Sequence, residues 1–178
     1  MSQMDLHFAD VGYAIAQLDM DELEKLSAVV DRVRQSSGVI YTCGNGGSHA
    51  TASHFANDLV KMVGVRAVCL GDLVPLATAM GNDTGWHMMY AGSLRLMLEK
   101  DDGVIGFSCS GESDNVIYAL NEAVARRVAC AALTGNSYES RINKLGLDAV
   151  VHVPDVEDIR VQEDVHLAVC HAVTRMYQ

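Results

Sequence analysis

The amino-acid sequence predicts an α/β fold in which helices cover both faces of a parallel β-sheet. Two observations carry this prediction. Short apolar segments of strand length recur along the chain, and longer segments of helical character separate them. Four of the five apolar segments end in small or hydroxyl residues, in the motifs GNGGS, GDL, CSGES and TGNS. Such alternation is typical of parallel sheets, whose ligands bind at the carboxyl ends of the strands.

The composition fits one domain with a full core. The chain has 178 residues, of which 49% are hydrophobic and two are proline, so a long disordered segment is not expected. A net charge of −10 argues against a nucleic-acid-binding surface. No apolar run approaches the ~20 residues of a membrane span, and the first residues, MSQMD, lack signal-peptide character. The five cysteines lack CxxC pairing, and we expect buried thiols in a cytoplasmic protein.

The first part of the chain, residues 1–36, is predicted to be an arm of two helices. The first helix has a loose apolar stripe, and the second has a clearer one from Leu23 to Val33. Asp19 or Asp21 can cap the second helix. We expect this arm to pack on the core or on a second subunit, and residues 37–178 to hold the sheet.

The remaining elements are predicted in alternation. We expect strands at residues 39–43, 66–70, 104–108, 128–133 and 149–153. We expect helices at residues 49–62, 71–80, 86–98, 113–125 and 157–177, and a short helix within 138–145. Gly81-Asn82-Asp83 is predicted to end the helix at residues 71–80.

The glycine-rich turn GNGGS lies between the first strand and its helix. This arrangement directs free backbone N–H groups and the positive end of a helix dipole at an anion. Ser48 can cap the helix, while Gly46 and Gly47 let the backbone approach a ligand closely. The motif is neither GxGxxG nor GxxxxGK[ST], so it does not argue for a dinucleotide or for ATP. A tight connection without a ligand is the alternative.

A second hydroxyl-rich loop follows the third strand. Ser108, Ser110 and Ser113 lie within six residues, immediately before a predicted helix. Hydroxyls and exposed N–H groups at a helix start can bind phosphate without a cationic side chain. An ordinary capping serine is the alternative, but the presence of GNGGS on another strand favours a phosphate site.

Together, the motifs CGNGGSHATASHFANDLV, SCSGESDNVIYAL and LTGNS have the order and spacing found in SIS-domain sugar-phosphate proteins. The chain resembles the phosphoheptose (sedoheptulose 7-phosphate) isomerase family over nearly its whole length. The resemblance implies a SIS domain at residues 37–178, a five-stranded parallel sheet in flavodoxin-like order, and a homotetramer whose sites are completed by neighbouring subunits. It also implies that Ser108, Ser110 and Ser113 hold the sugar phosphate. The sugar itself would contact Asn45, Gly46, Gly47, Ser48 and Asp83.

Two helices carry candidate metal ligands. His54 and Asp58 are four residues apart, so both project from one face of a helix and can bind one ion, unless they form only a solvated surface pair. The closing helix contains Gln162, Glu163, Asp164, His166 and His171. At ~100° per residue, Glu163 and His171 lie about 80° apart, whereas Gln162 and His171 lie about 180° apart.

The family that the chain resembles binds zinc through the His and Glu of HFAxE and through the Gln and His of a QExH…H helix. His54 matches directly, and Asp58 stands where the family has the longer Glu. Aligning the two histidines of the last helix puts Glu163 at the Gln position, with Asp164 and Gln162 as lesser candidates. The resemblance therefore implies a Zn²⁺ site formed by His54, Asp58, Glu163 and His171.

The resemblance implies an aldose–ketose isomerase that acts on sedoheptulose 7-phosphate or a closely related ketose phosphate, with Asp58 and His171 as its base and acid. One alternative is a non-catalytic SIS protein, such as a replication-initiator-associating protein or a sugar-phosphate-sensing regulator. Proteins of that kind tend to lack the acid of HFAxE and the final His, both of which this chain keeps. Another alternative is an isomerase of a related ketose phosphate in natural-product sugar synthesis.

Overall fold

The computed structural model describes residues 2–135 and 137–177 and confirms the predicted α/β fold. Five parallel strands form one sheet in the order β2-β1-β3-β4-β5, which is the flavodoxin-like order. The strands are β1 (Val39–Gly44), β2 (Arg66–Cys69), β3 (Gly103–Ser108), β4 (Ala129–Thr134) and β5 (Ala149–His152). Because the strands are parallel, the loops after β1 and β3 meet at the same edge of the sheet.

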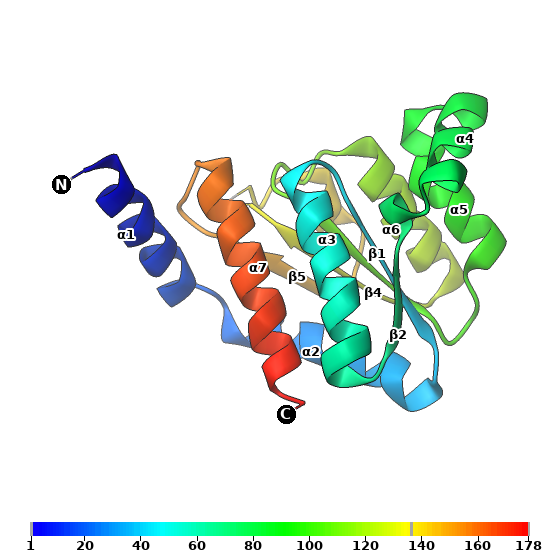
Figure 1. Ribbon diagram of the computed structural model, residues 1–178, viewed down its shortest axis with the longest axis horizontal. Helices are drawn as coiled ribbons and strands as arrows, with labels where there is room; N and C mark the ends of the chain where they lie inside the picture. The colour runs from blue at the N-terminus through cyan, green and yellow to red at the C-terminus, as the bar shows by residue number, and fades with distance from the viewer. Residues whose placement is uncertain (1, 136, 178) are drawn as a thin grey trace.

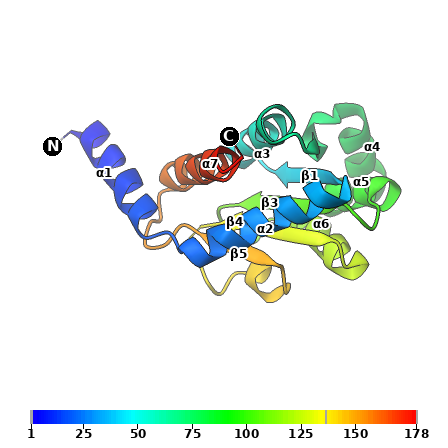
Figure 2. The same ribbon diagram turned by 90° about the horizontal axis from the view of Figure 1, so that it is seen from below.

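Seven α-helices surround the sheet in the described residues (Figure 1). They are α1 (Gln3–Ala16), α2 (Met20–Ser36), α3 (Gly47–Asp58), α4 (Val74–Thr84), α5 (Met89–Met97), α6 (Asp114–Arg126) and α7 (Ile159–Arg175). Helices α2, α3 and α7 share an apolar core with one face of the sheet, and α5 and α6 share a second core with the other face. Figure 2 shows α3 and α7 side by side on the same side of the sheet.

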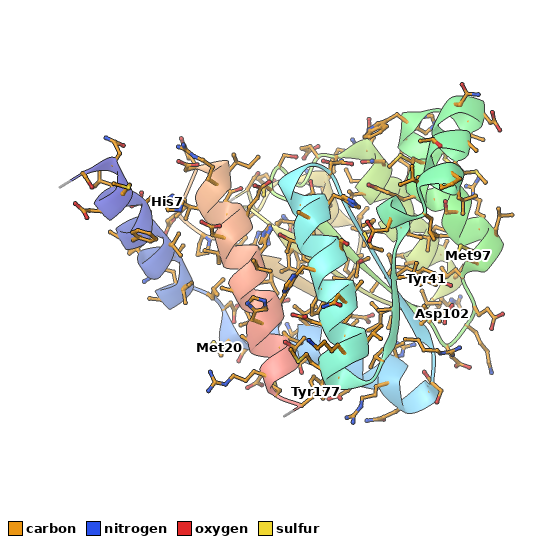
Figure 3. The ribbon with its side chains drawn as sticks, in the orientation of Figure 1. His7, Met20, Tyr41, Met97, Asp102 and Tyr177 are labelled. Atoms are coloured by element: carbon orange, nitrogen blue, oxygen red, sulfur yellow. The ribbon has the colours of Figure 1, made fainter. Side chains whose placement is uncertain are left out.

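The strands are apolar because both of their faces are buried. Ile40 packs into the core under α2, α3 and α7, whereas Tyr41 packs into the core under α5 and α6. Asp102 (Figure 3) lies just before β3, and its carboxylate accepts from the backbone N–H of Val39, the first residue of β1, at 2.7 Å. Tyr41 also donates to the carbonyl of Met97 at 3.3 Å.

The two N-terminal helices differ in how they pack. Asp19 caps α2, as predicted, by accepting from the N–H of Asp21 at 2.9 Å, and Leu26, Val30 and Val33 bury the apolar stripe of α2. Helix α1 stands at one end of the molecule beside α7 (Figure 1) and buries only Ala14 among its described residues. No helix of the described residues is both long and apolar enough to span a membrane.

Three predicted boundaries were wrong. Helix α3 begins at Gly47, so Gly46, with φ +57°, occupies the cap position, and Ser48 lies inside the first turn instead of capping it. The α-helix ends at Asp58 and continues as a π-helical turn (Leu59–Val63). Gly81-Asn82-Asp83 does not interrupt the helix. Helix α4 continues through these residues to Thr84, and it is followed by Gly85, where φ is +94°.

The start of one more helix is shifted, whereas the short helix predicted within residues 138–145 is confirmed. A 3-10 turn (Leu70–Asp72) follows β2, and α4 begins only at Val74, after the point at which we predicted it. In the segment predicted as a short helix, the structure has a 3-10 helix (Arg141–Lys144). Such segments are too short for a helical period to define their ends.

Candidate functional site

Three serine hydroxyls converge after β3, where the sequence predicts a phosphate site. The hydroxyl of Ser108 lies 3.4 Å from that of Ser110 and donates to that of Ser113 at 3.1 Å. Gly111, with φ +66°, turns the chain between them. Ser113 immediately precedes α6, but its side chain makes no capping hydrogen bond in the described structure. The hydroxyls are thus gathered at the positive end of a helix, an arrangement that suits an anion.

The glycine-rich turn after β1 contacts this serine loop. Asn45 and Asn115 exchange two amide hydrogen bonds, at 2.9 and 2.8 Å, and the hydroxyl of Ser48 lies 3.8 Å from Cys109 Sγ. The hydroxyl of Tyr90 donates to the carbonyl of Gly44. Asn115 was missed as a site residue, although it is the Asn of the SDNV motif. The sequence around Tyr90 does not indicate its contact with the turn, because Tyr90 belongs to α5 and is distant from the turn in the sequence.

Three of the four predicted metal ligands lie together between α3 and α7. His54 Nε2 lies 3.0 Å from His171 Nε2 and 3.2 Å from Asp58 Oδ2, and His171 Nε2 lies 3.7 Å from the same oxygen. Asp58 is 5% exposed, whereas both histidines are exposed. A buried carboxylate and two imidazole nitrogens that face one point form a set of donors able to hold a divalent cation.

The fourth predicted ligand, Glu163, lies outside this group. Its carboxylate covers the start of α3 so closely that a Cβ on Gly47 would lie 2.2 Å from its oxygen. The two lesser candidates are engaged elsewhere, since Gln162 donates to the carbonyl of Val156 at 2.6 Å and Asp164 pairs with His7 Nε2 at 2.8 Å. Of the three neighbouring side chains, Glu163 is therefore the one that faces α3.

Comparison with known proteins identifies the family. A family model described as "SIS domain" matches residues 7–135. The phosphoheptose isomerase of Burkholderia pseudomallei (strain 1710b) is 33% identical over 162 residues, which are 84% of this chain and 81% of that protein. The chain belongs to the SIS-domain phosphoheptose isomerase family. The phosphoheptose isomerase of a Nitratiruptor species is 37% identical over 137 residues, 74% of this chain and 72% of that protein.

A solved structure of this family has the same fold over nearly the whole chain. The phosphoheptose isomerase of Neisseria gonorrhoeae superposes with a TM-score of 0.88 at 30% identity, covering 99% of this chain and 98% of that one. Membership of the phosphoheptose isomerase family confirms the prediction of an aldose–ketose isomerase of sugar phosphates. It favours an enzyme over the non-catalytic SIS proteins considered as the alternative.

Asp83 differs from the other predicted sugar ligands because it is on α4 and not in the glycine-rich turn. It is exposed in the last turn of α4, where it accepts from Asn82 Nδ2 at 2.9 Å. Among the described residues, no hydrogen bond joins it to Asn45 or Ser48. Its prediction came from the family motif and still lacks a contact that would support it.

A further functional candidate is His166, to which the sequence assigned no role. Its side chain is completely buried, and its Nε2 donates to the carbonyl of Thr134, at the end of β4, at 3.0 Å. Burial lowers its pKa to about 4, so the imidazole is neutral near pH 7. His166 thereby anchors α7 to the sheet, with Glu163 and His171 on either side of it along the helix.

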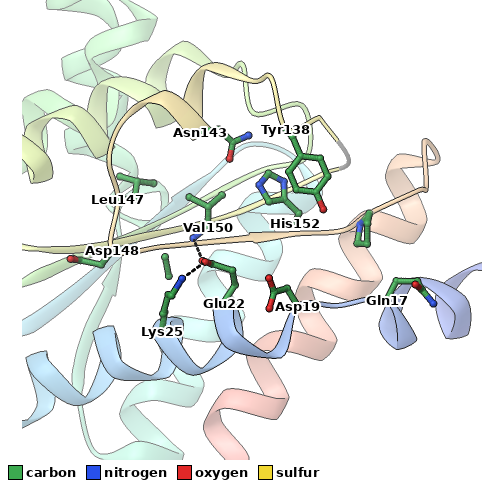
Figure 4. Close-up of a pocket in the computed structure, with 12 residues that line it drawn as sticks. Gln17, Asp19, Glu22, Lys25, Tyr138, Asn143, Leu147, Asp148, Val150 and His152 are labelled. Carbon is green, nitrogen blue, oxygen red and sulfur yellow. Dashed lines mark hydrogen bonds and ion pairs between the residues drawn. The ribbon is translucent and has the colours of Figure 1, made fainter.

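A cavity of about 380 Å³ lies elsewhere, between the start of α2 and the edge strand β5 (Figure 4). Glu22 lines it and accepts from the N–H of Val150 at 2.8 Å and from Lys25 at 2.6 Å. Tyr138 packs on His152 with the ring centroids 4.2 Å apart. None of its lining residues is a predicted site residue, so the cavity does not belong to the candidate site.

Proposed function

We propose that the chain converts sedoheptulose 7-phosphate, or a closely related ketose phosphate, into the corresponding aldose phosphate through a metal-assisted enediolate. Family membership supports the class of reaction. The observation that carries the proposal is the group of His54, Asp58 and His171, because a serine cradle alone would also serve a protein that only binds sugar phosphates.

In this proposal Ser108, Ser110 and Ser113 hold the phosphate through hydroxyl hydrogen bonds at the start of α6. Arg141, on the neighbouring 3-10 helix, is already engaged by Asp114 at 2.6 Å. In a chain of net charge −10, the hydroxyls and the helix dipole therefore supply most of the attraction for the phosphate.

The sugar is proposed to lie along the glycine-rich turn. Asn45 and Ser48 supply polar side chains there, and Gly46 and Gly47 let the backbone approach the hydroxyl groups of the sugar. Asp83 remains part of the proposal, as the family motif implies. It is exposed in the last turn of α4 and is therefore accessible to a ligand.

The proposed metal is Zn²⁺, held by His54, Asp58 and His171. Glu163, whose carboxylate faces Gly47 in this structure, would turn toward the ion to become the fourth ligand. Separations of 3.0 to 3.7 Å between the donor atoms of the first three bracket the roughly 3.4 Å expected around a tetrahedral zinc ion. When bound, the cation supplies positive charge near the oxygens of the enediolate.

Proton transfer is assigned to Asp58 and His171. Isomerisation needs a base to take a proton from carbon and an acid to return a proton to the neighbouring position. The carboxylate of Asp58 is buried, and the imidazole of His171 is exposed on the side open to a ligand. Oδ2 of Asp58 faces the two histidines, so Asp58 would take the proton on Oδ1, which accepts a hydrogen bond from Asn57 Nδ2 at 3.0 Å.

The proposal includes a homotetramer located in the cytoplasm. Helix α1 exposes apolar side chains that a neighbouring subunit could cover, among them Met4 and Phe8, at 73% and 74% exposure. His54 and His171 are exposed as well, which supports a site completed by another subunit. The five cysteines are buried and unpaired, as is common in a reducing compartment.

Replacement of Asp58 by Asn tests the proton transfer. Asn keeps the size of the side chain but cannot act as the base, so we expect kcat to fall by about 10²- to 10⁴-fold. Exchange of the C1 or C2 proton of the substrate with solvent should be lost, while binding of the phosphate survives. Asp164→Asn, which removes an exposed carboxylate of α7, serves as the control and should keep normal turnover.

Normal turnover and normal exchange in Asp58→Asn would refute this assignment of the base. If Glu163→Gln lost the exchange instead, the base would be Glu163. The metal is tested separately: exhaustive chelation should abolish turnover, and His54→Ala should lower the metal content by one ion per chain. An enzyme that stays fully active without metal contradicts the metal-assisted part of the proposal.

A further inference from the structure

A second group of metal-ligating side chains lies on another side of α3. His49 is in the first turn of α3, Cys69 ends β2, and Asp72 ends the 3-10 turn that follows. One donor atom from each of the three lies within 4.8 Å of the other two. His49 Nδ1 is 3.5 Å from Cys69 Sγ, and His49 Nε2 is 3.2 Å from Asp72 Oδ1. None of these residues is a proposed ligand or catalytic group of the isomerase site, although His49 lines a cavity of about 310 Å³ together with Asn45 and Gly46.

The local structure holds His49 and Cys69 in place and anchors one carboxylate oxygen of Asp72. In the sheet register Cys69 pairs with Thr42 near the end of β1, which brings the end of β2 beside the start of α3. Residue 71 is glycine, and a Cβ there would lie 2.5 Å from His49 Cε1, so the imidazole packs directly on this backbone. Ser53, one turn further along α3, donates to Asp72 Oδ2 at 2.6 Å and orients the carboxylate.

We propose that His49, Cys69 and Asp72 form a second metal site, which binds a divalent transition metal of the Zn²⁺ type. Thiolate, imidazole and carboxylate together suit Zn²⁺ or Co²⁺, whereas Mg²⁺ and Ca²⁺ select oxygen ligands. Zinc–ligand bonds at a tetrahedral angle place a thiolate sulfur and an imidazole nitrogen about 3.5 Å apart, which is the separation between Cys69 and His49.

Asp72 and a water molecule would fill the remaining two coordination positions of the ion. Cys69 is 3% exposed, whereas Asp72 is exposed and can move from His49 Nε2 to the ion that His49 Nδ1 and Cys69 hold. The fourth position faces solvent on the Asp72 side and suits a water molecule. Among the described residues no Lys or Arg pairs with Asp72, whose ion-pair partner is His49 Nε2 at 3.2 Å.

The position of this site indicates what the metal would do. An ion there joins the end of β2 to the first turn of α3, two residues beyond Gly47 of the glycine-rich turn. It would therefore stabilise the folded protein by an amount that grows with the logarithm of the free metal concentration, and it would restrain the turn. This inference goes beyond the isomerase function and does not depend on it.

Cobalt binding tests the site, because a Co²⁺–thiolate bond gives a charge-transfer absorption in the near ultraviolet. The proposed isomerase metal site contains no thiolate, so this absorption reports on a cysteine ligand alone. The full chain is stripped of metal and titrated with Co²⁺. We expect the absorption in the wild type and in His54→Ala, and its loss in Cys69→Ser. Cys130→Ser replaces a strand cysteine of the same 3% exposure and should keep the absorption.

A second pair of variants tests the site independently, in case Cys69→Ser does not fold. Asp72→Asn and Ser53→Ala change exposed or partly exposed side chains, and each should weaken Co²⁺ binding at this site by about 10- to 100-fold, with unchanged thermal unfolding in the absence of metal. Absence of the thiolate absorption in the wild type overturns the proposal. So does its persistence in a folded Cys69→Ser protein, or equal affinity in Asp72→Asn and the wild type.

Discussion

Protonation of His166 would place a positive charge in the apolar core between α7 and the sheet. Its Nε2 already donates to Thr134, and among the described residues its Nδ1 has no hydrogen-bond partner. A proton on Nδ1 would thus be a buried donor without an acceptor. Burial accordingly lowers the pKa of His166 from 6.5 to about 4. We predict that this histidine makes the folded protein lose stability between pH 7 and pH 5.

The sign and the size of this change in stability follow from the pKa of His166 in the unfolded chain, 6.5, and in the folded protein, about 4. Between pH 6.5 and pH 4 the unfolded chain binds a proton at this position and the folded chain does not, so the free energy of unfolding falls as the pH falls through this window. At pH 5 the loss from this group is about 2 kcal/mol, and below pH 4 it approaches about 3 kcal/mol. Near pH 7 the contribution is close to zero, since the histidine is neutral in both states.

The assay is urea unfolding at pH 7 and at pH 5, for the wild type and for His166→Asn. Asn can still donate to Thr134 but does not titrate, and all other groups are the same in both proteins. We expect the wild type to lose about 2 kcal/mol more than the variant between the two pH values. An equal loss in both proteins would refute the reasoning. So would an NMR titration in which the ring of His166 becomes protonated above pH 6.

Two further predictions concern the phosphate cradle and the glycines. Ser110→Ala removes an exposed hydroxyl of the cradle and should raise KM for the sugar phosphate by about 10- to 150-fold, as expected for a hydrogen bond to a charged group, whereas Ser110→Thr should retain binding. A KM unchanged in Ser110→Ala would argue against this cradle. Gly44→Ala should lower the melting temperature, because its Cβ would lie 2.7 Å from the backbone oxygen of Ser48. Gly81→Ala meets no atom within 4 Å in α4 and should stabilise the protein by up to about 1 kcal/mol, and melting curves that rank the two variants in the opposite order would contradict this packing argument.

The elements of the fold could be predicted because the strands and helices have distinct local patterns. Strands such as β3 and β4 are buried along their whole length and read as unbroken apolar runs between turns. The ends of helices were harder to predict. Gly81-Asn82-Asp83 has the composition of a turn, yet the positive φ that ends α4 falls at Gly85, and backbone conformation at one residue is not encoded by composition alone.

The candidate site was predictable where its residues share one element. His54 and Asp58 meet because they are one helical turn apart, and the three serines meet because one short loop carries them. Asn115, His49, Cys69 and Asp72 depend instead on contacts between elements. Nothing in the spacing of Cys69 and His49 indicates that their side chains lie 3.5 Å apart, because that distance follows from the pairing of β2 with β1.

The choice among Gln162, Glu163 and Asp164 illustrates the same limit. Helical geometry fixes the angles between these side chains, but the face of α7 that meets α3 depends on how α7 is rotated on the sheet. Two buried contacts set that rotation: His166 donates to Thr134, and Gln162 donates to Val156. With Gln162 turned inward and Asp164 turned toward α1, Glu163 is left facing Gly47, on the same side as His171 faces Asp58. The acidic side chain that α7 presents to α3 therefore follows from two inward-facing polar residues, His166 and Gln162, and not from the spacing of the acidic residues themselves.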